Sequence, residues 1–565
     1  MAQEVKILNG TSRQARYNGT IFDNTSLTGK GWRQSSNKLS TRPIISTLAI
    51  DRGINISETA SWNNLCDPME FSDMKKSVDR IHDAISKREK VGIIGDYDAD
   101  GITGTAQLVR YFKRHEIEPH VILPHRIHDG YGVSKKFIDA LSAHGTSLLI
   151  TVDTGISHAE ELNYAKNLGM DVIVTDHHSV PNVVPDSLIL HPSRDAACGV
   201  SKVNKNLSGS GVVFTLIRAL EDGNWKDKET DVALAAIGTV ADVVPLLREN
   251  RLIVQLGLLA MNNDNNDPVF DLTREVLTNG ERVTSSHIGF RIAPRINAAG
   301  RINDPSLALS ALLAGGDAIK KLHAINEERQ EETRRQMEIA DELIDVNSPV
   351  ITTASSDFHP GIVGLIAGRL TEKTGMPSCI GSVRDGKVTC SLRSISSYNI
   401  VEALKRCQDH LAGFGGHAKA AGCSVEISKW DEFAKAICAD AGSKLSDEDL
   451  VPKVEIDLEL ESSDITLDNA RDLQRLEPFG EGNREPLFLV KNQNISNLRC
   501  VGKEDQHLQC QIGDAKAVGF NLGHLLPSLT EHADIVCRLG TDSWGGHERV
   551  QMFVEDVSVA EKVGA

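Results

Sequence analysis

Short apolar runs alternate with helical patterns through the first half of the chain. Four β-branched runs predict buried strands: VGIIG (91–95), HVILP (120–124), SLLITVD (147–153) and DVIVTDHH (171–178). A helix-like stretch follows each of the first three, for example GITGTAQLVRYFKRHE (101–116). Strands that alternate with helices predict an α/β fold with a doubly wound parallel sheet. In such sheets, ligands lie at the carboxyl ends of the strands.

The pattern changes along the second half of the chain. Residues 306–345 predict mostly helix, with a break at Gly315-Gly316 and a charged run that is typical of a solvated helix face. SPVITTA begins a second α/β unit at about 349. From 486, evenly spaced short strands without helical patterns predict a small β-barrel or sandwich.

Composition and charge exclude several classes of protein. The chain has 565 residues, of which 40% are hydrophobic and 25% charged, so it is globular and comprises three or four domains. It contains neither an apolar run long enough for a membrane helix nor the apolar core of a signal peptide, which favours a cytoplasmic protein. The net charge of −17 argues against non-specific coating of nucleic acid, but not against a local cleft that binds it. The ten cysteines form no C-x-x-C pair, which disfavours a zinc finger and indicates reduced thiols.

The segment GDYDADG (95–101) carries the strongest chemical indication. Asp96, Asp98 and Asp100 directly follow a predicted strand, and their mutual repulsion favours a bound cation. A calcium loop does not fit, because a strand precedes the segment and Gln107 stands where the loop needs Glu. Taken alone, the segment would also fit a solvated acidic turn.

Acidic residues also follow, or lie within, other apolar segments. Asp153 follows one apolar run, Asp176-His177-His178 follows another, and Asp242 lies within the apolar segment GTVADVVPL. A single Asp at a strand end is usually a helix cap or a turn residue. Four such strand ends are hard to explain in that way, and in a parallel sheet they meet at one edge.

Oxygen ligands with one imidazole suit manganese or magnesium better than zinc. The four carboxylates of Asp98, Asp100, Asp153 and Asp242 match the charge of two divalent ions. A two-metal site is typical of enzymes that hydrolyse phosphate esters or anhydrides.

These residues resemble the DHH phosphoesterase superfamily, named for the Asp-His-His triplet found here at 176–178, and within it the RecJ family of single-strand-specific exonucleases. The resemblance runs from about residue 46 to the C-terminus. It rests on an ordered set of motifs: DRGI (51–54), DPMEFSDM (67–74), GDYDADGITGTA (95–106), VDTGIS (152–157), TDHHSVP (175–181), IGTVADVVPL (237–246), PRINAAGRIND (294–304), FHPGIVGLIAGRL (358–370), GFGGHAKAAG (413–422) and EPFGEGN (477–483).

The resemblance implies a domain order. After an N-terminal arm (1–45) we expect a DHH catalytic domain (46–310) and a connecting helix (311–348). A smaller α/β DHH-associated substrate-binding domain (349–445) and an OB-fold β-barrel that binds nucleic acid (446–565) would follow.

The resemblance also implies roles for the acidic cluster. Asp98 and Asp153 would hold one cation, helped by Asp96, and Asp100, Asp153, His177 and Asp242 would hold a second, with Asp153 bridging. His178 would face the scissile phosphate and act in catalysis, as would Asp96.

Substrate-binding residues are implied outside the acidic cluster. Arg301, in a loop of small residues, would bind the 5′-phosphate end with Ser391 and Arg393. Leu392 replaces the glycine usual in the family, which puts the local backbone path and the Ser391 contact in question.

The glycine-rich motif would also contact substrate. Its Gly415, Gly416 and His417 lie where glycines let the backbone approach a phosphate and a following helix start offers free N–H groups. The residues alone fit a glycine-rich turn against a small-residue helix equally well.

The resulting hypothesis is a 5′→3′ exonuclease specific for single-stranded DNA. It would use two divalent cations, manganese preferred or magnesium, to release 5′-mononucleotides in DNA repair and recombination. The alternatives are a DHH phosphodiesterase for oligoribonucleotides or cyclic dinucleotides, and a non-catalytic DNA-binding scaffold. The expected partner is a single strand with a 5′ end, with a single-strand-binding protein or helicase left open. The protein would be a monomer that does not bind membranes.

Overall fold

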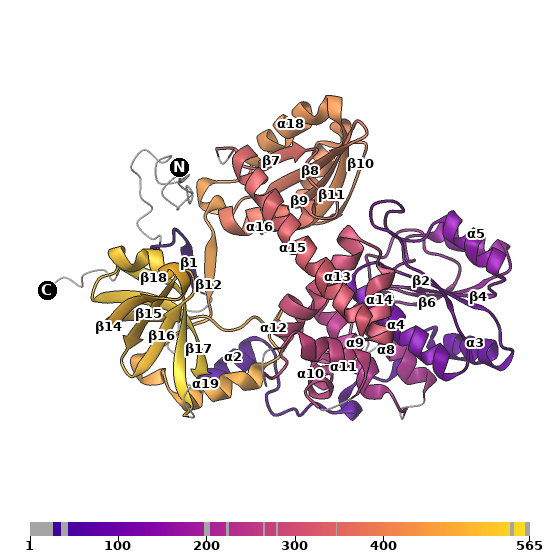
Figure 1. The fold of residues 1–565 in the computed structure, drawn as a ribbon, viewed down its shortest axis with the longest axis horizontal. Helices are drawn as coiled ribbons and strands as arrows, with labels where there is room; N and C mark the ends of the chain where they lie inside the picture. Colours follow the sequence, from indigo (N-terminus) through magenta and orange to yellow (C-terminus); the bar gives the residue numbers. More distant parts are fainter. Residues whose placement is uncertain are drawn as a thin grey trace. The chain divides into compact units, whose positions relative to one another are not determined.

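The computed structural model describes residues 26–34, 43–196, 204–221, 225–263, 266–277, 281–345, 347–542 and 547–559 (Figure 1). Its contacts divide the chain into two compact units. The catalytic unit comprises 57–335 together with 478–484, and the barrel unit comprises the rest of the chain. Among the described helices, none is both long and apolar enough to cross a membrane.

A five-stranded parallel sheet lies at the centre of the catalytic unit. Its strands are β2 (Val91–Gly95), β3 (His120–Ile122), β4 (Leu148–Val152), β5 (Asp171–Thr175) and β6 (Leu188–Leu190), in the order β3-β2-β4-β5-β6. Every neighbouring pair is parallel. The four predicted strands are therefore confirmed, and the fifth, β6, was not predicted.

Helices cover both faces of this sheet, as a doubly wound fold requires. Ile93 and Ile150 pack into one apolar cluster with α3 (Met74–Ser86), α4 (Ala99–Arg114) and α8 (Gly209–Leu220). Their sequence neighbours Ile94 and Leu149 pack into a second cluster with α5 (Lys135–His144) and α6 (Ala159–Asn167). Because alternate residues point to opposite faces, strands covered on both sides are apolar throughout.

The helices that follow complete the catalytic unit. They are α9 (Lys228–Ala241), α10 (Arg248–Met261), α11 (Pro268–Glu275), α12 (Ser285–His287), the π-helical η3 (Ile288–Ile292), α13 (Ala293–Ile302) and α14 (Ser306–Ala314). The predicted break at Gly315-Gly316 is confirmed, because α15 (Asp317–Leu343) begins directly after it.

Within the barrel unit, the DHH-associated region is a mixed five-stranded sheet in the order β10-β11-β9-β8-β7. Its strands are β7 (Ile351–Ser355), β8 (Ser378–Arg384), β9 (Lys387–Arg393), β10 (Gly413–His417) and β11 (Ala420–Glu426). Its helices are α16 (Val363–Thr374), α17 (Ile400–Arg406) and α18 (Trp430–Gly442).

The C-terminal strands form the predicted barrel. They are β13 (Leu458–Glu459), β14 (Phe488–Val501), β15 (His507–Ile512), β16 (Ala515–Gly519), β17 (His532–Asp542) and β18 (Arg549–Val559), and α19 (Leu467–Leu473) lies between β13 and β14. Strand β14 pairs with both β15 and β17, which closes the sheet. The runs PLFLV (486–490) and SNLRCVG (496–502) predict two separate strands. They form one bent strand, β14, with register shifts along it.

The described part of the N-terminal segment packs on the barrel. Strand β1 (Gly31–Gln34) runs parallel to β12 (Lys453–Ile456), and α2 (Ile44–Asp51) contacts α19. The Trp32 indole N–H donates to Asp556 Oδ2 at 2.8 Å, and the Thr28 hydroxyl donates to Asp556 Oδ1 at 2.8 Å. Asp556 is fully buried, so the segment satisfies a charge that would otherwise be costly inside the barrel.

We expect Trp32→Phe to destabilise the barrel unit. The variant keeps the ring but removes one donor to a buried carboxylate, which costs about 1–3 kcal/mol. The measurement is the urea midpoint of full-length protein, with the surface variant Arg33→Lys as control. An unchanged midpoint would show that the segment adds no stability.

Candidate metal centre

The carboxyl ends of three strands place acidic side chains at one edge of the sheet. Asp96 follows β2, and its N–H donates to Val152 O at 3.1 Å. Asp153 follows β4, and its N–H donates to Thr175 O at 2.8 Å. The first residue beyond each strand thus stays in register with the neighbouring strand. The predicted convergence of the strand ends is confirmed.

The start of α4 positions the next two carboxylates. Asp98 is the N-cap of α4, where its Oδ1 accepts from the N–H groups of Asp100 and Gly101 at 3.0 and 3.1 Å. Asp100 is buried, and its carboxylate accepts from the Gly209 and Ser210 N–H groups at the start of α8, at 2.6 and 3.0 Å. A helix N-terminus favours negative charge, which helps to hold Asp100 ionised.

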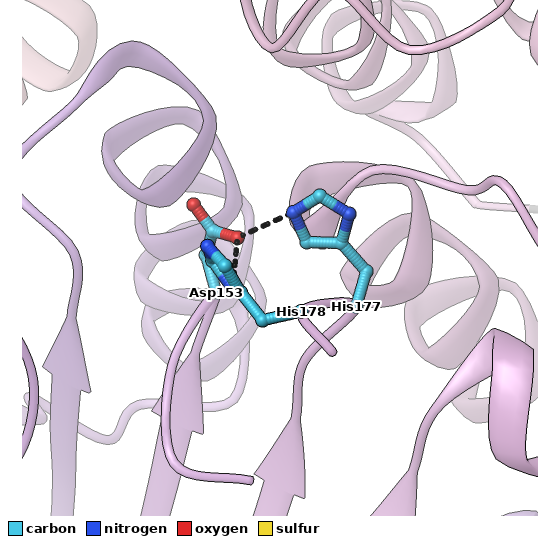
Figure 2. Close-up of side chains that lie close together, drawn as sticks. All are labelled: Asp153, His177 and His178. Carbon is cyan, nitrogen blue, oxygen red and sulfur yellow. Dashed lines mark ion pairs between the residues drawn. The ribbon is translucent and has the colours of Figure 1, made fainter. Parts of the chain in front are cut away.

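His177 lies among three of these carboxylates. Its Nε2 is 3.1 Å from Asp153 Oδ1, 3.5 Å from Asp242 Oδ2 and 3.9 Å from Asp100 Oδ2. Figure 2 shows Asp153 facing both imidazoles, and His178 Nδ1 lies 3.8 Å from the same oxygen of Asp153.

Asp242 reaches the cluster from a helix end and not from a strand end. It caps the C-terminus of α9, and its N–H donates to Gly238 O at 2.9 Å. The prediction that Asp242 follows a strand is therefore wrong. The apolar segment before it is a helix buried against α4 and α10, and its fully apolar character resembles that of a central strand.

Three groups of side chains are close enough to share a cation. Asp96, Asp98 and Asp153 form one, Asp100, His177 and Asp242 a second, and Asp153, His177 and His178 a third; within each, the candidate ligand atoms lie within 4.8 Å of one another. Asp153 takes part in two of the groups. Mostly oxygen donors with an imidazole suit manganese or magnesium.

Without a bound cation, burial and mutual repulsion disfavour the charged forms of the carboxylates. Burial, followed by repulsion from neighbouring carboxylates, raises the pKa of Asp100 to about 7 and that of Asp242 to about 9. The same causes hold the pKa values of Asp96 and Asp153 well above their ordinary range. A set of buried acids that cannot all ionise together fits a site for multivalent cations.

Asp176 has a different role from its neighbours. Burial raises its pKa, but hydrogen bonds from His178 Nδ1 and from the backbone N–H groups of Ile156 and His178 outweigh burial and lower the pKa to about 2. In return, the hydrogen bond and charge of Asp176 outweigh burial and raise the pKa of His178. Asp176 therefore orients His178, 2.8 Å away, while His177 faces the acidic cluster.

Two residues near the cluster were missed in the sequence. Tyr131 Oη lies 3.2 Å from His178 Nδ1 and donates to Asp153 O at 3.4 Å. The Arg126 guanidinium lies 4.3 Å from the centre of the Tyr97 ring, and its charge lowers the pKa of Asp96 against the effect of burial. Both follow β3 in the segment HRIHDGYG (125–132).

The comparisons with known proteins cover the same regions. The models of the DHH family N-terminal domain, the DHHA1 domain and the RecJ OB domain match residues 90–239, 347–442 and 456–556. The chain is 33% identical over 544 residues to the single-stranded-DNA-specific exonuclease RecJ of Bacillus subtilis, covering 92% of this chain and 68% of that protein. The chain belongs to the RecJ family.

Other RecJ proteins extend the likeness. The Escherichia coli protein is 30% identical over 561 residues, covering 91% of this chain and 96% of that protein. The crystal structure of RecJ in complex with Mn²⁺ from Thermus thermophilus superposes with a TM-score of 0.79 at 27% identity, over 92% of this chain and 76% of that one. A second RecJ structure, bound to manganese, gives a TM-score of 0.58 at 32% identity, over 67% of this chain and 96% of that one.

The prediction that Arg301 lies in a loop is wrong, because Arg301 lies in the helix α13. A Cβ at its neighbour Gly300 would lie 2.5 Å from Tyr97 O, and Asn297 Oδ1 accepts from the Ala99 N–H at 2.9 Å. Small residues in this segment therefore serve close packing of a helix against the GDYDADG segment. The same contacts bring Arg301 near enough to Tyr97 that its charge lowers the tyrosine pKa, although burial raises that pKa more.

Ser391 and Arg393 lie on β9 of the barrel unit. They share one face of the strand, and Arg393 Nη1 donates to Ser391 Oγ at 3.2 Å. Leu392 points to the other face and is fully buried in the core of the DHH-associated region. The residue that replaces the usual glycine thus fills the core and leaves β9 a regular strand.

The glycine-rich motif forms a β-hairpin. Gly415, Gly416 and His417 lie on β10, an exposed edge strand that pairs with β11. The expectation of a helix start after the glycines is wrong, because β11 follows. Gly416 has φ +136°, and a Cβ there would lie 2.5 Å from Ala420 O, so the close approach of β10 to β11 at this point requires glycine.

We expect the metal-free protein to lose stability as the pH rises. The raised carboxyl pKa values of Asp100 and Asp242 give stability that is complete below the ordinary value of 3.8 and is lost through about 7 and about 9. Mn²⁺ at a hundred times its Kd would add about 2.7 kcal/mol, and its effect should be larger at about pH 8 than at about pH 5. Melting temperatures with chelator and with Mn²⁺ at both pH values provide the measurement. A Mn²⁺ effect that is equal at both would contradict the assignment.

Proposed function

We propose that this chain is a metal-dependent 5′→3′ exonuclease that hydrolyses the terminal phosphodiester of single-stranded DNA and releases 5′-mononucleotides. The observation that carries this proposal is the gathering of Asp98, Asp100, Asp153, His177 and Asp242 within ligand distance at the edge of the sheet, in a member of the RecJ family. Action in the cytoplasm as a monomer during repair and recombination, with a single-strand-binding protein or a helicase as partner, is part of the same proposal.

The side chains divide into two cation sites that share Asp153. Asp98 and Asp153 would hold one ion, with Asp96 beside them, and Asp100, Asp153, His177 and Asp242 would hold the other, with manganese preferred and magnesium as the alternative. Two such ions supply Lewis-acid stabilisation of charge on the phosphate oxygens and make water a better nucleophile near neutral pH. The chain's own contribution is to hold these ligands in place before substrate arrives.

His178 is suited to donate a hydrogen bond or a proton to the scissile phosphate. Its Nδ1 is engaged by Asp176 at 2.8 Å, which fixes the ring and favours the charged form. Within the described chain, Nε2 has no carboxylate partner and lies 3.4 Å from Tyr131 Oη, so it is the nitrogen that would face substrate oxygens. Tyr131 Oη, 3.2 Å from Nδ1, limits rotation of the same ring.

Recognition of the strand is assigned to both units. In the catalytic unit, Arg301 would bind the 5′-phosphate, and in the barrel unit Ser391 and Arg393 would do the same. The exposed hairpin with Gly415, Gly416 and His417 offers backbone groups to a phosphate backbone.

The barrel presents a groove suited to single strands. The groove, of about 1240 Å³, lies over β14, β15, β16 and β18. Arg499, Lys516 and Arg549 supply positive charge, and Gln509, Gln511 and Gln551 supply amide groups. Lys516 is partly neutralised by Asp542 at 3.4 Å, which moderates the charge.

Aromatic rings lie on the same face of the barrel, because His507 and Phe553 stand two residues from the groove residues Gln509 and Gln551 along β15 and β18. Phe520, 56% exposed, stacks on Phe553 at 6.5 Å between ring centres, and His507 meets Phe520 edge-on at 5.3 Å. Cations beside an exposed ring are the combination by which OB-folds hold single strands without reading sequence.

The central test is hydrolysis by Asp153→Asn. Loss of the shared carboxylate should lower turnover of single-stranded DNA by at least about a hundredfold, while strand affinity in chelator stays within about twofold. The assay uses 5′-labelled DNA with Mn²⁺, alongside dinucleotides and pyrophosphate. The exposed variant Asp139→Asn is the control. Near-normal turnover by Asp153→Asn would defeat the two-metal proposal, and preference for dinucleotides or pyrophosphate would defeat the substrate assignment.

The barrel groove is tested separately with Phe520→Ala. Loss of one stacking ring costs about 1–3 kcal/mol, so affinity for a long single strand should fall roughly tenfold. Hydrolysis of dinucleotides, which offer no extended strand for the barrel to hold, should not change. Ile427→Ala, which trims another exposed apolar side chain of the same unit, is the control. Equal strand affinity in Phe520→Ala and wild type would remove this face from the binding site.

A further inference from the structure

The segment Pro478–Arg484 belongs by its contacts to the catalytic unit, although the chain before and after it belongs to the barrel unit. It contains most of the EPFGEGN motif, which the sequence associates with the start of the barrel. None of its residues is near enough to the acidic cluster to be counted among the candidate ligands in the described chain. Its role must therefore be sought in what it contacts.

The segment is a tight, self-supported turn. The Gly480 N–H donates to Asn483 O at 2.9 Å and the Asn483 N–H donates to Gly480 O at 3.1 Å. Gly482 has φ +70°, a conformation that favours glycine. Asn483 is fully buried, and its amide donates to Pro478 O at 2.8 Å. A turn with this many internal hydrogen bonds is a rigid element and not a passive linker.

The turn contacts the residues that follow Asp242. The Leu246 N–H donates to Glu481 O at 2.8 Å. A Cβ at Gly480 would lie 2.6 Å from the buried Leu246 side chain, and a Cβ at Gly482 would lie 3.1 Å from the Pro245 ring. On its other side, the turn is held by the Ser285 hydroxyl, which donates to Phe479 O at 2.6 Å.

A strained position lies between Asp242 and the residues that the turn contacts. Val243 has φ +59°, which is rare for a β-branched residue, and its side chain is 63% exposed. Such a conformation persists only where surrounding contacts hold it. The side chain of Val243 offers little packing, and its N–H donates to Val240 O at 3.3 Å. The residues beyond it, 245–247, are held by the Glu481 carbonyl and the glycines of the turn, together with the Asn250 amide, which donates to Pro245 O at 3.0 Å.

We propose that Pro478–Arg484 is a clasp that holds the strained turn after α9 and thereby positions the Asp242 carboxylate for cation binding. The residues of the clasp are positioning residues, since they act through the backbone of 243–247 and touch neither cation nor substrate. This inference rests on the proposed function only in taking Asp242 as a cation ligand. Asp242 requires these contacts because it lies at the end of α9, whereas the backbones of Asp96 and Asp153 are held by hydrogen bonds to neighbouring strands.

The test is Mn²⁺ binding to full-length Gly482→Ala, measured without DNA by the electron paramagnetic resonance of free Mn²⁺. The added methyl forces a left-handed alanine against the Pro245 ring, so the Mn²⁺ site that includes Asp242 should lose affinity by about tenfold, as for other residues that orient a ligand. Turnover at low Mn²⁺ should fall, recover at high Mn²⁺, and leave KM for single-stranded DNA unchanged. Ser285→Ala, which removes one hydrogen bond without strain, should show the same change in smaller degree.

Gly169→Ala is the matched control. Gly169 also has a positive φ, +88°, and lies in the catalytic unit, but a Cβ there would meet nothing within 4 Å. It should carry the cost of a left-handed alanine without the loss of Mn²⁺ affinity. If Gly482→Ala and Ser285→Ala bind Mn²⁺ as wild type does, or if Gly169→Ala weakens binding equally, the clasp is refuted. If wild type itself neither binds Mn²⁺ nor cleaves DNA, the proposed function fails instead, and the inference with it.

Discussion

The repulsion among buried carboxylates is the constraint on which the rest of this structure depends. Asp96, Asp100, Asp153 and Asp242 are brought together where burial and mutual repulsion raise all of their pKa values. A fold that gathers these groups works against its own stability unless cations bind, so the surrounding elements must be strong enough to hold them. The buried parallel sheet, with apolar clusters on both faces, supplies that strength.

Local backbone geometry shows how tightly the site is built. Asp153 has φ +59°, an uncommon conformation for a residue other than glycine. A Cβ at Gly209 would lie 2.5 Å from its carboxylate oxygen, and one at Gly238 would lie 2.5 Å from Asp100 Oδ1. The first residue of α8 and the last turn of α9 therefore come as near to the carboxylates as backbone can. Side chains there would displace the ligands, which explains why glycines stand in these helices despite their cost to helix stability.

The sequence predicted the parts of this site that regular strands determine. Because β2, β4 and β5 are buried on both faces, their apolar runs are unmistakable, and the residues directly after them had to meet at one edge. Elements without such periodicity could not be assigned. The apolar helix α9 resembled a strand, the small residues of α13 resembled a loop, and the glycines of β10 resembled the approach to a helix. Tyr131 and Arg126 were missed because their roles depend on side-chain direction, which periodicity does not encode. Which unit each segment joins was equally hidden, since Pro478–Arg484 has no pattern of its own.

The three residues of the Asp-His-His triplet have different roles in the site. The three follow a single strand, yet the backbone N–H groups of His177 and His178 turn Asp176 inward, at 2.7 and 3.1 Å. Several donors lower the pKa of Asp176, whereas burial and repulsion raise the pKa values of the nearby cluster carboxylates, and the hydrogen bond and charge of Asp176 raise the pKa of His178 and orient its ring. His177, one residue earlier, instead turns toward Asp153, Asp100 and Asp242. A carboxylate whose oxygens already accept several hydrogen bonds is a poor metal ligand. Asp176 therefore supports the site by orienting His178 and not by binding a cation.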